Sequence, residues 1–85
     1  MGEVTAADAL LRLRALNPDR PVEVLVRYAD AFAQYHEAAD NLARNGIITA
    51  HPRTGAPLEN PYLKVRNAAS EILAAIKLNT EGMWP

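Results

Sequence analysis

The sequence contains no cysteine and no long apolar run. Without cysteine the chain can form no disulfide bond, no zinc-thiolate site and no thiol nucleophile. No uninterrupted apolar segment approaches the roughly 18 residues that a transmembrane helix needs. The start, Met1-Gly2-Glu3-Val4, does not resemble a signal peptide. We therefore expect a protein without a membrane partner.

Residues that form catalytic or metal sites are also scarce. The only histidines are His36 and His51, and neither has a second histidine at metal-ligand spacing. His36 falls on an apolar stripe of a predicted helix, where a core or interface histidine is the simpler interpretation. Glu37 and Asp40 can share a helix face, but without a histidine or glycine-rich context they are typical of solvated surface. We predict no enzyme activity, no bound metal and no cofactor.

The chain is short for an independently stable core. It has 85 residues, of which 49% are apolar, but 16 of these apolar residues are alanine. Alanine buries little area, and a domain of this size is near the lower limit for a single hydrophobic core. The chain is therefore a candidate for completing its core against a neighbouring subunit.

Hydrophobic periodicity and turn residues predict a short helix followed by a long one. The first spans residues 6–16, with Thr5 as its N-cap, and the proline-containing segment 17–21 ends it. The second starts near Pro21, runs to about Arg44, and ends at the Asn45-Gly46 C-cap, because glycine adopts the left-handed conformation at low cost.

The long helix carries two apolar stripes, each with alternating spacings of three and four. One stripe comprises Val22, Leu25, Ala29, Phe32, His36, Ala39 and Ala43, and the other comprises Val24, Tyr28, Ala31, Tyr35, Ala38 and Leu42. A partner helix in a hairpin covers only one stripe. The other must meet the first helix or another subunit.

A small β-tongue is predicted between the long helix and a third helix. Ile47-Ile48-Thr49 can pair with Leu58-Glu59 around the Pro52-Arg53-Thr54-Gly55 turn. Asn60-Pro61 then starts the third helix, which we expect to continue to Lys77. Its apolar seam is Tyr62, Val65, Ala69, Ile72 and Ile76. Beyond it we expect a tail in which Trp84 is exposed or ordered by a partner.

These elements predict an all-α fold that oligomerises through helix faces. A short N-terminal helix and linker (1–20) precede a long antiparallel helical hairpin interrupted by the tongue (21–80), and residues 81–85 form a tail. The residues predicted to build the oligomer are Val24, Tyr28, Phe32, Tyr35, Leu42, Tyr62, Val65, Ile72 and Ile76.

Charge is unevenly distributed, although the formal net charge is only −1. Residues 22–43 carry four acidic side chains against Arg27, and residues 44–66 carry four basic side chains against Glu59. Repeated around a ring of subunits, such basic residues would give sequence-independent affinity for DNA phosphates. The predicted DNA-binding residues are Arg44, Arg53, Lys64 and Arg66, and a second candidate surface on or beside the first helix comprises Arg12, Arg14 and Arg20. The alternative is that these charges balance the acidic helix of the same or a neighbouring subunit.

An ordered set of short motifs accompanies this pattern. It consists of Tyr28-Ala29-Asp30-Ala31-Phe32 with Tyr35, Asn45-Gly46-Ile47-Ile48, Gly55, Asn60-Pro61, Ala68-Ala69 with Glu71, and Leu78. In this order the motifs resemble the small subunits of bacteriophage terminases, over about 60 of the 85 residues.

The resemblance implies a non-enzymatic, ring-forming protein of a tailed phage or prophage. Such a protein binds viral double-stranded DNA at the start of genome packaging. It also engages the large terminase subunit, which holds the ATPase and nuclease, in the host bacterial cytoplasm.

Two alternatives remain open from the residues alone. One is a small helical protein-interaction module, such as an adaptor or antitoxin-like dimer, that uses Tyr28, Tyr35 and Leu42 to hold a partner and does not bind DNA. The other is a compact three-helix monomer in which the first helix covers that stripe.

Overall fold

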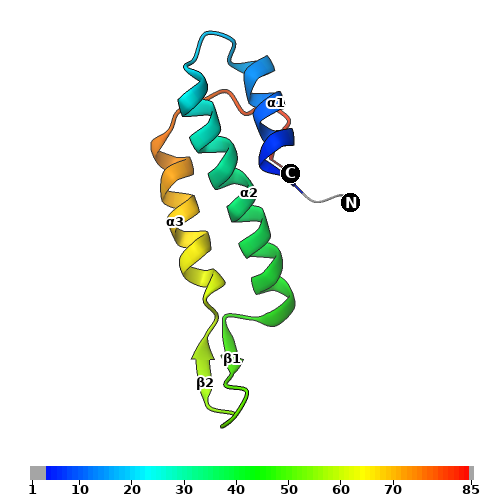
Figure 1. The fold of residues 1–85 in the computed structure, drawn as a ribbon, viewed down its shortest axis with the longest axis vertical. Coiled ribbons are helices and arrows are strands. Elements are labelled where there is room, and N and C mark those ends of the chain that lie inside the picture. Colours follow the sequence, from blue (N-terminus) through cyan, green and yellow to red (C-terminus); the bar gives the residue numbers. More distant parts are fainter. Residues whose placement is uncertain (1–3, 85) are drawn as a thin grey trace.

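The computed structural model describes residues 4–84, which form three α-helices and one β-ribbon (Figure 1). Helix α1 spans Ala6–Leu16, α2 spans Val22–Asn45 and α3 spans Tyr62–Ala75. Strands β1 (Ile48–Ala50) and β2 (Pro57–Glu59) lie between α2 and α3. The predicted all-α fold, with a short N-terminal helix, a long helical hairpin and a β-tongue, is confirmed.

Local capping sets the bounds of α1 and α2. The Thr5 hydroxyl accepts a hydrogen bond from the backbone N–H of Asp8 at 3.1 Å, as an N-cap residue does. Pro21 precedes α2, and Gly46 ends it with a φ of +80°. A side chain at that φ is strained, so glycine is the residue that lets the chain leave the helix here.

Helix α2 packs against both α1 and α3, and side chains of both stripes are buried. Leu25, Ala29 and Phe32 of one stripe belong to the core cluster together with Ala9 and Leu13 of α1. The second stripe is buried at Tyr28, Ala31, Ala38 and Leu42. The sequence predicted that the stripe left open by α3 would pack against either the first helix or another subunit. In the structure, α1 packs against α2 and covers part of its apolar surface.

The β-tongue is an antiparallel ribbon that projects beyond the ends of α2 and α3 (Figure 1). Thr49 lies opposite Leu58, and Ile48 lies opposite Glu59. The strands are thus close to the predicted segments, with β1 shifted by one residue. Gly55 has a φ of +71° at the tip, where its N–H donates to the His51 carbonyl at 2.8 Å.

The end of α3 differs from the expectation. The helix stops at Ala75, and Ile76 is already extended, with φ −98° and ψ 118°, so the predicted continuation to Lys77 is wrong. The physical reason is that Ile76 and Leu78 pack against the core cluster. An extended chain can place both of these residues on the core while it turns back toward α1.

The tail after α3 is anchored to the rest of the chain. Asn17 Nδ2 donates to the Asn79 carbonyl at 2.9 Å, and the Asn79 N–H donates to Asn17 Oδ1 at 2.8 Å. Met83 is buried in the core cluster. Trp84 stays 37% exposed, but its ring lies 4.7 Å from that of Phe32. Of the two expectations for Trp84, the exposed position is the one found, and its ring also packs against Phe32 of its own chain.

Candidate nucleic-acid interface and the groove on helix α2

The predicted DNA-binding residues separate into two groups at opposite ends of the molecule (Figure 1). Arg12 and Arg14 are exposed on α1. The other four lie around the tongue: Arg44 in the last turn of α2, Arg53 in the tongue, and Lys64 and Arg66 near the start of α3. The structure thus places Arg44, Arg53, Lys64 and Arg66 at one end of the molecule, and we call these four the tongue-end basic residues.

Asn60 holds the elements that carry these residues in place. Its side chain is 3% exposed, and its Nδ2 donates to Asn41 Oδ1 at 2.9 Å and to the Gly46 carbonyl at 3.0 Å. Its Oδ1 accepts from the Tyr62 N–H at 3.0 Å, which confirms the predicted cap of α3. One side chain therefore ties together the end of α2, the base of the tongue and the start of α3. No pattern in the sequence predicts the hydrogen bonds from Asn60 to Asn41 and to Gly46.

The guanidinium groups at this end retain donors for a ligand. Arg44 Nε donates to the Asp40 carbonyl at 3.4 Å, and Arg66 Nη2 donates to Asn67 Oδ1 at 3.5 Å. Both bonds are long. Because each guanidinium has five N–H donors, most of them can still reach a phosphate.

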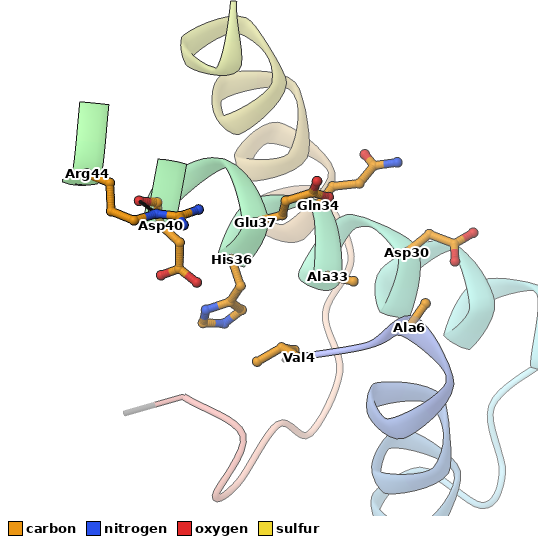
Figure 2. Close-up of a pocket in the computed structure, with 9 residues that line it drawn as sticks. All are labelled: Val4, Ala6, Asp30, Ala33, Gln34, His36, Glu37, Asp40 and Arg44. Carbon is orange, nitrogen blue, oxygen red and sulfur yellow. Dashed lines mark hydrogen bonds between the residues drawn. The ribbon is translucent and has the colours of Figure 1, made fainter. Parts of the chain in front are cut away.

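A groove of about 510 Å³ lies on the outer face of α2, beside the start of α1 (Figure 2). Its lining combines small apolar side chains with three carboxylates and one guanidinium. The lining residues are Val4, Ala6, Asp30, Ala33, Gln34, His36, Glu37, Asp40 and Arg44. Acidic charge is therefore in excess along this groove, which we call the α2 groove.

His36 lines the α2 groove and packs among aromatic rings. Its ring centroid lies 4.5 Å from that of Phe32 and 5.2 Å from that of Trp84. Its Nε2 is buried and has no hydrogen-bond partner among residues 4–84. Within the same residues, no group of three or more His, Asp or Glu side chains is placed to hold a metal ion. These contacts fit the interpretation of His36 as a packed histidine.

The residues predicted to build an oligomer are mostly used for packing inside the chain. Tyr28, Phe32 and Leu42 are buried. Val65 is 38% exposed, and the remaining five are half-buried, namely Val24, Tyr35, Tyr62, Ile72 and Ile76. A subunit contact through these faces stays a prediction.

Several large apolar side chains that no sequence pattern singled out are exposed. Leu11 on α1 is 67% exposed and Ile48 in the tongue is 61% exposed. Ile47 and Leu58 are 50% and 43% exposed. The exposure of the tongue residues could have been predicted, because a two-stranded ribbon has no second layer of structure to cover its apolar side chains.

None of the helices within residues 4–84 combines the length and apolar character required to cross a membrane.

A family model described as phage terminase, small subunit, matches residues 5–79. The matched region includes all three helices and the tongue. No curated protein and no solved structure matches the chain. Because this family model covers most of the sequence, the chain belongs to the phage terminase small subunit family.

Proposed function

We propose that the protein is a ring-forming assembly factor that recognises viral double-stranded DNA, starts genome packaging and engages the large terminase subunit. It has no catalytic activity of its own and works in the host bacterial cytoplasm. Membership of the terminase small subunit family supports this role. The observation that carries the DNA contact is the set of tongue-end basic residues, placed on elements that Asn60 ties together.

Phosphate contacts explain how an acidic chain can bind DNA. The formal net charge is −1, but the tongue end carries four basic side chains against Glu59. In a ring this local excess is repeated by every subunit. Lys and Arg contacts to phosphates release counterions, so affinity should fall steeply with salt and depend little on base sequence.

Three double variants with the same charge change test which end contacts DNA. Lys64→Glu/Arg66→Glu removes two tongue-end charges, Arg12→Glu/Arg14→Glu removes the α1 pair, and Arg27→Glu/Lys77→Glu is the matched control at exposed positions outside both groups. Binding to a labelled duplex is measured by fluorescence anisotropy over a salt series, and circular dichroism verifies folding.

The tongue-end variant should bind at least about tenfold more weakly than the control and show a shallower salt dependence. Equal binding by all three variants would remove the tongue end from the proposal. Failure of the unaltered protein to bind duplex DNA at low salt would remove direct DNA recognition.

A compact monomer that binds one protein partner is the second candidate. The observation in its favour is that α1 and α3 cover both stripes of α2 within one chain. Absolute mass from light scattering separates the candidates, because a ring requires a species well above the dimer, whereas this candidate stays at 9.3 kDa.

A further inference from the structure

We propose that the tongue of one copy docks in the α2 groove of the next copy. This inference rests on the self-association in the proposed function and assigns that self-association to two particular surfaces. Because the surfaces differ, the contact is head-to-tail. A head-to-tail contact builds a ring when its rotation closes and a filament when it does not.

The tongue has the properties of an inserted element. Ile48 on one face of the ribbon is 61% exposed, Leu58 on the other face is 43% exposed, and Arg53 lies in the turn at its tip. It projects beyond the helices along the longest dimension of the molecule, which measures 53 Å (Figure 1). An isolated two-stranded ribbon is marginal in water, so support from a second surface would stabilise it.

The α2 groove offers complementary chemistry. Val4, Ala6 and Ala33 give it an apolar component, and its volume of about 510 Å³ accommodates a side chain as large as isoleucine. Three carboxylates line it, from Asp30, Glu37 and Asp40, against one guanidinium from Arg44 (Figure 2). A tongue that enters with its Ile48 face inward and Arg53 at its tip therefore meets both an apolar surface and an excess of negative charge, which favours encounter in one orientation.

A second copy is the favoured occupant because one chain carries both halves of the contact. Helices α1 and α3 already pack against α2, whereas Ile47, Ile48 and Leu58 of the tongue stay exposed within residues 4–84. Arg53 at the tip enters the contact, whereas Lys64 and Arg66 lie on α3, behind the tongue, and stay available to DNA.

The test uses one variant for each surface. The tongue variant is Ile48→Ser/Arg53→Glu, and the groove variant is Asp30→Lys/Asp40→Lys. Glu37 is left unchanged because its Oε1 accepts a hydrogen bond from the Tyr62 hydroxyl at 3.5 Å, so its replacement would change a contact between α2 and α3 as well as the groove. The matched control is Asp19→Lys/Glu71→Lys, which makes the same charge change at exposed positions outside the groove.

Mass is measured by light scattering on a sizing column for each variant alone and for an equimolar mixture. Like charges placed across the contact should weaken self-association by about 100-fold or more in either variant. The control should assemble like the unaltered protein. In the mixture, the intact tongue of the groove variant can enter the intact groove of the tongue variant. At the next contact the carboxylate introduced by Arg53→Glu faces the ammonium groups introduced by Asp30→Lys and Asp40→Lys, so opposite charges meet again and the mixture should assemble further than either variant alone.

The possible results separate this inference from the proposed function. Variants that assemble as the unaltered protein does would overturn the tongue contact and leave a ring built through other faces. A mixture that stays monomeric would also overturn it. An unaltered protein that is monomeric at all concentrations would overturn both proposals. Circular dichroism and the fluorescence emission of Trp84, the only tryptophan, verify that each variant is folded. The milder substitutions Arg53→Gln and Asp40→Asn remove a charge without reversing it, so each should weaken assembly by a smaller factor.

Discussion

The two ends of this molecule are built differently. At the α1 end, side chains from α1, α2 and the tail meet in one core cluster, with Leu73 of α3 packed against it. At the tongue end, the chain thins to two strands whose residues are all exposed except Thr49, which is half-buried. Stability is thus concentrated at one end, and the residues of the opposite end have few contacts within their own chain.

Each end has a buried asparagine that joins segments distant in the sequence. Asn17 is 8% exposed and binds Asn79 of the tail. Asn60 is 3% exposed and binds Asn41 and the Gly46 carbonyl. The first bond pair closes a core that apolar packing already stabilises. The hydrogen bonds of Asn60 lie where little apolar packing is available. They therefore contribute a larger fraction of the stabilisation at the tongue end.

The largest expected effect is at the core of the α1 end. Leu13 is fully buried, so Leu13→Ala should lower the free energy of unfolding by about 3–5 kcal/mol through lost burial and the cavity it leaves. Leu11→Ala, on the same helix but 67% exposed, is the control and should change it by no more than about 0.5 kcal/mol. Urea unfolding followed by circular dichroism measures both. Equal losses would mean that α1 does not belong to the core.

Features set by neighbouring residues could be predicted from the sequence. Thr5 as an N-cap, Gly46 as a helix end and the Thr49 to Leu58 region as a ribbon all depend on residues close in the chain. The fold class and the bounds of α1 followed from such signals and from apolar periodicity.

Features that depend on distant segments could not be predicted. Met83 and Trp84 are two adjacent residues without periodicity, and only the return of the tail to α2 gives them a partner. The same limit applies to the candidate site. The sequence shows that Arg12 and Lys64 are basic, but only the fold places them at opposite ends of the molecule.

An intermediate effect is expected at the tongue end from Asn60→Ala. The change leaves the Gly46 carbonyl and Asn41 without their hydrogen-bond donor and removes the cap of α3, which should cost about 2 kcal/mol. Asn67→Ala, at an exposed position on α3, is the control. Hydrogen exchange should show faster exchange at the base of the tongue, while amides of α1 change less. Uniform acceleration across all helices would contradict the separation of the two ends.

The smallest effect is expected within the tongue. Ile48→Ser replaces a side chain that is 61% exposed, so the free energy of unfolding should change by about 0.5 kcal/mol or less. The measurement is made by urea unfolding at protein concentrations low enough to keep the chain monomeric, because any contact between copies would add its own contribution. A loss above about 1 kcal/mol would mean that Ile48 packs against its own chain. The tongue would then belong to the folded core, and the contrast between the two ends would fail. A small loss in the monomer, together with weakened assembly, would instead place the contribution of Ile48 in contacts with other molecules.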